Sequence, residues 1–193
     1  MFKYPTCYPP RVSGSQIRYE QMKKTIVQEF NAPLKVVLSA REGRWVEKDK
    51  IPDLKSADEI HRREDDKVIF VERESSASSH IPERFRKYVS PEMLKWTEHS
   101  TWHKDTNLHE WRVTPANYAS FLDARGKTRY EEIAAGNCPR SRRTLEITLN
   151  VKVPMLGPIA ENMIFESFKK NFEKDFDAIK ERAAKILRQT EPV

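Results

Sequence analysis

The chain has 193 residues, of which 38% are hydrophobic and 33% charged, and its 35 Lys and Arg against 29 Asp and Glu give a net charge of +6. A chain of this length can bury a sizeable core as one domain without metal or disulfides, and it contains no run near the ~18 apolar residues that a membrane span needs. Because acidic residues lie among the basic ones, we expect a solvated surface of mixed charge and no nucleic-acid partner.

The chain begins with an expected N-terminal arm, residues 1–20, which is rich in proline and shows no hydrophobic period. The arm lacks the continuous apolar core of a signal peptide. The two cysteines, Cys7 and Cys138, form neither a CxxC pair nor a Cys/His cluster, which favours a reducing compartment. We therefore expect a cytoplasmic protein without cofactor or metal, in which residues 21–188 form a single domain and 189–193 a C-terminal tail.

The first half of the domain predicts strands and one short helix. Residues 22–30 favour a strand, and Asn31 is a suitable cap for a helix over 34–40. After a charged connector, the runs 59–63 and 67–73 flank a turn-like pair of aspartates and predict a hairpin. A serine-rich stretch ends this hairpin.

The second half of the domain predicts a series of strands, after a segment with helical tendency at 82–88. Strands are expected at 94–103, 108–114, 118–122, 127–135 and 144–153, with turns at 105–107 and 123–126. In the first of these strands Trp96 and Trp102 share a face, which marks the interior side. The last strand alternates strictly between apolar and polar residues, as a half-buried strand does. Strands joined by turns predict an antiparallel meander.

A long amphipathic helix is expected to follow Gly157 and Pro158. Seven apolar side chains fall within an arc of roughly 80° on this helix. They are Phe165, Phe168, Phe172, Phe176, Ile179, Ala183 and Ile186. About thirty residues give a rod of roughly 45 Å, which is long enough to cross an entire curved sheet.

The order of these elements, together with two short motifs, resembles a known superfamily. The run IVQEFNAP at 26–33 is similar to the opening strand and helix start of the START-like (SRPBCC) superfamily, and VKVPMLGPIAEN at 151–162 resembles the strand-to-helix junction of an uncharacterised bacterial DUF2505-like family. The resemblance covers residues 22–187 and implies the α+β helix-grip fold, a curved antiparallel sheet wrapped around a long C-terminal helix. It also implies a cavity between the two that binds lipid or another hydrophobic molecule.

Large aromatic side chains and one carboxylate are the expected ligand-binding residues. They are Phe70, Trp96, Trp102, Trp111, Glu161, Phe165, Phe168 and Phe172. The aromatic members suit a cavity wall and a solid core equally. Glu161 lies within the apolar arc of the helix, so it either holds the polar end of a ligand or accepts a hydrogen bond from a loop N–H near the helix start.

Other polar residues in the predicted strands raise similar questions. Glu98 shares the interior face with the tryptophans, and we prefer a salt bridge to a facing arginine such as Arg129 over a chemical role. His99 and His103 lie about 13 Å apart if both are on one strand, which is too far for a single metal ion. No catalytic or metal-binding residue is assigned.

We expect a non-enzymatic protein that binds or transfers a hydrophobic small molecule or lipid, with burial contributing ~0.8 kcal/mol for each CH₂ group. One alternative is a cyclase-like or hydrolase-like enzyme that uses Glu161, Glu98 and histidines as acid/base groups in the same cavity. Another is a peripheral protein that contacts anionic membranes through the basic cluster Arg140, Arg142 and Arg143, for which a solvated loop is the other interpretation.

Overall fold

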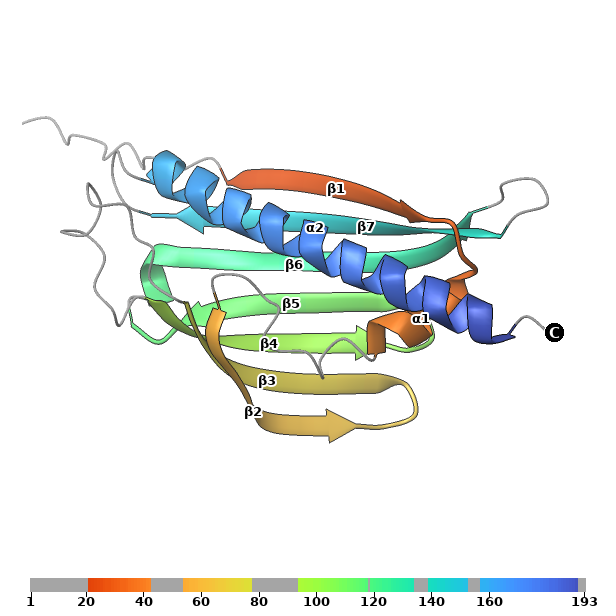
Figure 1. Ribbon diagram of the computed structural model, residues 1–193. Helices are drawn as coiled ribbons and strands as arrows, with labels where there is room; N and C mark the ends of the chain where they lie inside the picture. The colour runs from red at the N-terminus through yellow and green to blue at the C-terminus, as the bar shows by residue number, and fades with distance from the viewer. Residues whose placement is uncertain are drawn as a thin grey trace, which may run out of the picture.

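The computed structural model describes residues 21–42, 54–77, 94–117, 119–133, 139–152 and 157–190. Within them a single antiparallel sheet packs one of its faces against a long helix (Figure 1). The elements are β1 (Met22–Phe30), α1 (Leu34–Glu42), β2 (Leu54–Glu64), β3 (Val68–Ala77), β4 (Lys95–His103), β5 (Leu108–Pro115), the 3₁₀ helix η5 (Ala119–Phe121), β6 (Leu122–Ile133), β7 (Arg140–Val151) and α2 (Gly157–Thr190). The predictions for 1–20, 82–88 and the last three residues of the tail lie outside the described residues.

The sheet has seven strands in the order β1-β7-β6-β5-β4-β3-β2. Strands β2 to β7 are neighbours in chain order, whereas β1 pairs with β7 and so brings the two ends of the chain's β region together. Figure 1 shows α2 running diagonally over the sheet from β1 and β7 towards α1. The predicted helix-grip architecture is therefore confirmed: a curved antiparallel sheet with a long C-terminal helix and one short helix after the first strand.

Alternation along β7 shows how the sequence selects the face that α2 covers. On the side towards α2, hereafter the inner face, Leu145, Ile147 and Leu149 are at most 2% exposed. Between them Glu146 is exposed and Thr148 is half-buried on the opposite, outer face. Because successive side chains of a strand point to opposite faces, this pattern buries one side of β7 completely.

Two predictions about β6 are wrong. The expected turn at 123–126 lies inside β6, where Gly126 pairs with Trp111 of β5 on one side and Ile147 of β7 on the other. A Cβ atom on Gly126 would lie 2.5 Å from Cζ2 of Trp111, so this glycine provides space for an indole and does not mark a turn. Within the expected strand at 118–122, residues 119–121 form the helix η5, and β6 begins only at Leu122.

Helix α2 has 34 residues, which at ~1.5 Å per residue make it about 51 Å long. Its C-terminal half packs against α1: Ile179 and Ala183 of α2 and Val37 and Ala40 of α1 are all at most 3% exposed. The ring of Phe176 packs there against Phe30, with centroids 4.7 Å apart. No helix among the described residues has the length and apolar composition needed to cross a membrane.

Candidate functional site

The candidate site is the inner face of the sheet together with the side of α2 that faces it. Strand register arranges the inner-face residues in rows that run across the sheet. One row joins Leu149, Ala124, Val113, Glu98 and Arg73, from β7 to β3. The row changes from apolar to charged between β5 and β4, so the inner face has an apolar side and a polar side.

An aromatic group covers the apolar side of the inner face. The indole of Trp111 meets the ring of Phe168 edge-on, with centroids 5.5 Å apart at 86°, and Phe168 in turn contacts Phe172 at 6.3 Å. Phe165 packs on the same cluster, and the ammonium group of Lys24 lies 5.8 Å from its ring centroid. Trp111, Phe165, Phe168 and Phe172, predicted separately from strand and helix patterns, therefore lie together.

Packing along α2 is uneven. Around its C-terminal half, seven residues from the helices, the sheet and the β1–α1 connection are at most 4% exposed, while Phe176, Ile186 and Leu187 of α2 are partly buried. In the apolar cluster around its N-terminal half the buried residues are Ala124, Ile147 and Leu149, all from the sheet, while Ile164 and the three phenylalanines of α2 are only partly buried. Both halves of the helix therefore carry partly buried phenylalanines, but the completely buried apolar residues of α2, Ile179 and Ala183, lie in its C-terminal half.

Trp102 and Trp96 also lie on the inner face, but apart from that aromatic group. Trp102 belongs to the tightly packed end, where the guanidinium of Arg41 lies 4.1 Å from its ring centroid and Tyr130 meets it edge-on at 6.0 Å. Trp96 pairs with Ser75 of β3 and is half-buried on the polar side. The three tryptophans therefore occupy three different environments on one face.

Phe70 lies on the outer face, away from α2. Its neighbour Ile69 pairs with Trp102, which points inward, so Phe70 must point outward. There its ring contacts His61 at 6.1 Å. The strand 67–73 was predicted from its composition, which does not indicate which of its two faces is buried, and Phe70 is therefore corrected to a position outside the candidate site.

Glu161 is 6% exposed, and its Oε1 accepts a hydrogen bond of 2.8 Å from the backbone N–H of Val151. Val151 is the last residue of β7, where the ladder of the sheet ends. The carboxylate thus satisfies a buried donor at the strand end and attaches the start of α2 to the sheet. This geometry matches the structural alternative for Glu161 given by the sequence.

The basic cluster of β7 is neither a loop nor a set of free charges. Arg140 donates a 2.6 Å hydrogen bond to Glu29 of β1, and Arg142 donates a 2.9 Å bond to the other oxygen of the same carboxylate. The hydrogen bond from Arg142 lowers the pKa of Glu29 from its ordinary value, and the charge of Arg140 acts in the same direction. The loop interpretation of these arginines is wrong.

Arg143 points to the inner face and is 1% exposed. It donates to Gln28 of β1 at 2.8 Å and to the backbone oxygen of Phe172 in α2 at 3.0 Å, and it pairs with Asp175. Burial acts to lower the pKa of Arg143, but Tyr130 and Asp175 raise it above its ordinary value. This buried network attaches the middle of α2 to two strands. In the sequence, the network is indicated by an arginine at a position of β7 where the alternation calls for an apolar residue.

A second buried arginine, Arg73, lies on the polar side of the inner face. Its guanidinium nitrogens are 3.6 Å from the carboxylates of both Glu98 and Glu59, and its side chain is 10% exposed. The expected salt bridge of Glu98 therefore exists, but with Arg73 and not with Arg129. Arg129 pairs in register with Leu108, on the outer face, because it alternates with the inward Thr128 and Tyr130.

The two histidines of β4 point away from the candidate site. His99 and His103 lie on the outer face, where His99 Nδ1 is 2.9 Å from Glu72 and His103 Nε2 is 3.2 Å from Glu110. In the described part of the chain, no group of three or more His, Cys, Asp or Glu side chains is arranged to hold a metal ion.

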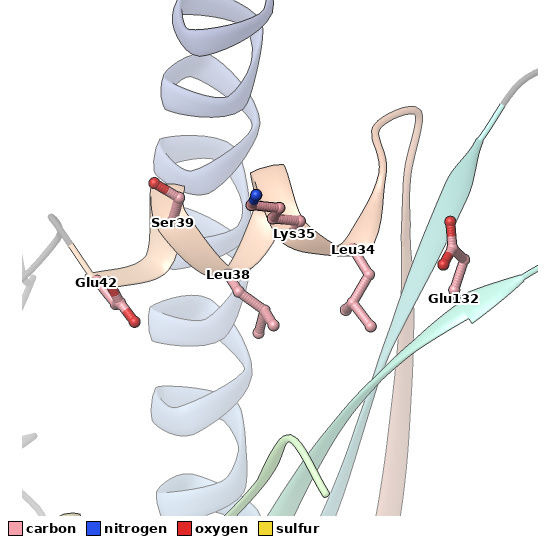
Figure 2. Close-up of a pocket in the computed structure, with 6 residues that line it drawn as sticks. All are labelled: Leu34, Lys35, Leu38, Ser39, Glu42 and Glu132. Atoms are coloured by element: carbon pink, nitrogen blue, oxygen red, sulfur yellow. The ribbon is translucent and has the colours of Figure 1, made fainter. Parts of the chain in front are cut away.

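A surface pocket of about 460 Å³ lies beside α1. Figure 2 shows Leu34 and Leu38 pointing from α1 towards β6, with Lys35, Ser39, Glu42 and Glu132 around them. Leu34 and Leu38 also pack on the tightly buried cluster, which separates this pocket from the Trp111 side of the inner face. It is therefore an additional hollow and not part of the site predicted from sequence.

Comparison with known protein families identifies the family of this chain. The DUF2505 family, described as a protein family of unknown function, matches residues 25–182. The chain belongs to this family. No curated protein matches the sequence.

Solved structures similar to this DUF2505 protein show its fold class. The Zhui aromatase/cyclase from a Streptomyces species superposes with a TM-score of 0.61 at 14% identity, covering 90% of this chain and 100% of its own. TTHA0849 from Thermus thermophilus has a TM-score of 0.58 at 13% identity, covering 88% and 100%. Ara h 8.0201 has a TM-score of 0.57 at 14% identity, covering 86% and 99%. These likenesses confirm the helix-grip (SRPBCC) fold.

Proposed function

We propose that this DUF2505 protein binds a hydrophobic small molecule or lipid between the inner face of the sheet and the N-terminal half of α2, without chemical transformation of the ligand. The observation that carries the proposal is the partial exposure of Phe165, Phe168 and Phe172 on the helix and of Trp111 facing them. The same helix buries Ile179 completely further along. Apolar side chains of α2 are completely buried only in its C-terminal half, at Ile179 and Ala183. Partly exposed aromatic side chains that gather over one side of a sheet provide a surface for an apolar ligand.

The fold class supports this proposal, because helix-grip proteins generally bind hydrophobic molecules in this position. Binding would arise from shape and from removal of apolar surface from water, at ~25 cal/mol per Å². The aromatic rings of Trp111 and Phe168 provide a broad, stiff contact surface for an aliphatic chain or a ring system.

The described acid and base groups give no comparable support to an enzyme. General acid/base chemistry needs groups within hydrogen-bond reach of one reacting atom. Glu161 is bonded to Val151, Glu98 pairs with Arg73, and His99 lies on the outer face. His109 lies on the inner face, where its ring contacts Trp102 at 6.5 Å. These groups are not seen to converge on one reacting atom, so the binding function without catalysis is the better proposal.

Binding is tested by titrating purified protein into Nile red, a neutral dye whose emission rises in apolar surroundings, and by native mass spectrometry for co-purified lipid. Phe168→Ala should weaken Nile red binding roughly tenfold, because one large aromatic contact contributes on the order of 1.5–3 kcal/mol. The matched control is Phe176→Ala, on the same helix but in the tightly packed end. Because Phe176 is partly buried, its loss should lower the unfolding free energy by about 1–3 kcal/mol and leave dye affinity unchanged in the folded protein.

Two results would contradict the proposal. One is a wild-type protein that neither carries lipid nor binds Nile red. The other is equal loss of dye affinity in the Phe168 and Phe176 variants, since binding would then not depend on the accessible half of the helix.

A further inference from the structure

The charged side of the inner face suggests what the polar end of the ligand is. Arg73, Glu98 and Glu59 lie on β3, β4 and β2, in line with the apolar row that α2 covers. Neighbouring strands are ~4.8 Å apart, so Glu98 lies about 10 Å from Ala124 across the sheet. A molecule whose apolar part contacts Trp111 and Phe168 therefore has its end within reach of this cluster.

The cluster is buried at its centre and opens to solvent at Glu59. Arg73, Ser75 and Ser100 are 5–8% exposed, whereas the side chains of Glu98 and Glu59 are 26% and 38% exposed. On β6 and β7, inner-face positions in the same row carry Ala124 and Leu149, and the next row carries Ile147. A buried ion pair recovers little more than its desolvation cost, so fold stability alone does not account for charges at these positions.

The charges of the cluster decide which ligand group it accepts. One guanidinium faces two carboxylates, each at 3.6 Å, and together the three groups carry a net charge of −1. A ligand carboxylate or phosphate that approaches buried Arg73 would be repelled by Glu98 and, with more solvent screening, by the exposed Glu59. A hydroxyl group both accepts from Arg73 and donates to Glu98, whereas a carboxylate only accepts and an ammonium group only donates.

We infer that the Arg73, Glu98 and Glu59 cluster is the polar subsite of the ligand-binding site, and that it selects an apolar molecule ending in a neutral hydroxyl over one ending in an anion. This inference rests on the proposed function. It assigns a ligand class and a specificity-determining pair, Arg73 and Glu98, to one side of the inner face.

The test uses three ligands with the same twelve-carbon chain: dodecan-1-ol, dodecanoate and dodecylammonium. Each competes with Nile red at pH 7.5, below its micelle-forming concentration. In the wild-type protein dodecan-1-ol should displace the dye at roughly tenfold lower concentration than dodecanoate, which corresponds to one hydrogen bond with a charged group. Dodecylammonium should displace the dye at a concentration between these two, because the negative net charge of the cluster attracts it while Arg73 repels it.

Glu98→Gln removes one negative charge and should reduce the preference for the alcohol over the carboxylate to about twofold or less. The matched control is Glu72→Gln, which makes the same charge change on β3 beside Arg73. Because Glu72 points to the outer face and pairs with His99, its variant should keep the wild-type preference. Arg73→Gln, checked by circular dichroism for folding, should weaken the binding of dodecan-1-ol. If this variant does not fold, the comparison of Glu98→Gln with Glu72→Gln decides whether the polar subsite exists.

The outcomes separate this inference from the function on which it rests. If the wild-type protein binds neither the dye nor any twelve-carbon ligand, the proposed function fails. If all three ligands bind equally, or if Glu98→Gln and Glu72→Gln behave alike, the polar subsite is wrong while hydrophobic binding stands.

Discussion

The carboxylate of Glu161 holds the backbone N–H of Val151 at 2.8 Å and thereby joins the start of α2 to the last residue of β7. Residues at the two ends of the strand-to-helix connection are thus attached directly to each other. The accessible aromatic group lies immediately beyond this contact along α2, so the contact sets where the N-terminal half of the helix lies over the sheet.

Glu161→Ala should lower the unfolding free energy by about 1–3 kcal/mol, because it leaves the buried N–H of Val151 without an acceptor. Glu161→Gln retains an oxygen acceptor, so it should lower the unfolding free energy by less than half as much as Glu161→Ala. Urea denaturation measures both values. Glu166→Ala, an exposed position one turn further along α2, is the control and should change stability by less than about 0.5 kcal/mol. Equal losses for Ala and Gln at 161 would show that the hydrogen bond is not what stabilises this junction.

Arg143→Ala should be the most destabilising of the arginine substitutions in β7, by about 3–5 kcal/mol, because Asp175 loses its buried partner. Arg142→Ala removes a partly exposed ion pair and should change stability by at most about 1 kcal/mol. Chemical denaturation of both variants, with Asp175→Asn and the double variant, gives the coupling energy between Arg143 and Asp175. A coupling energy near zero would contradict the fastening role assigned to this pair.

The ion pairs of Glu29 predict a pH dependence of stability. Arg142 and Arg140 lower the pKa of Glu29 below its ordinary value of 4.5. The folded pKa is lower than the unfolded one, so the stabilisation is fully present above about pH 4.5 and is lost as the pH falls through the folded pKa. Denaturation of wild type and Glu29→Gln should therefore differ by a constant amount near neutral pH and converge in acid. A difference that does not change between pH 7 and pH 3 would exclude this linkage.

Prediction from sequence was most successful where a pattern is local. The alternation at 144–153 identified the buried face of β7, and the 3.6-residue period of α2 placed Phe168 and Phe172 towards the sheet. Both patterns arise within one element, because the period of side-chain direction is a property of the helix or strand itself. Apart from the region of η5 and β6, the sequence alone therefore determined the element order, the antiparallel sheet and the apolar side of the long helix.

Only the tertiary structure decided which residues meet across strands. The partner of Glu98 is Arg73 and not Arg129, Phe70 points outward, and Gly126 lies inside a strand beneath an indole. Each of these features depends on strand register, which the neighbouring strands set jointly. A one-residue change in register would turn every side chain of a strand to the opposite face of the sheet. The polar subsite and the buried Arg143 network follow from that register, and so does the division of the inner face into a packed end, an accessible aromatic side and a charged side.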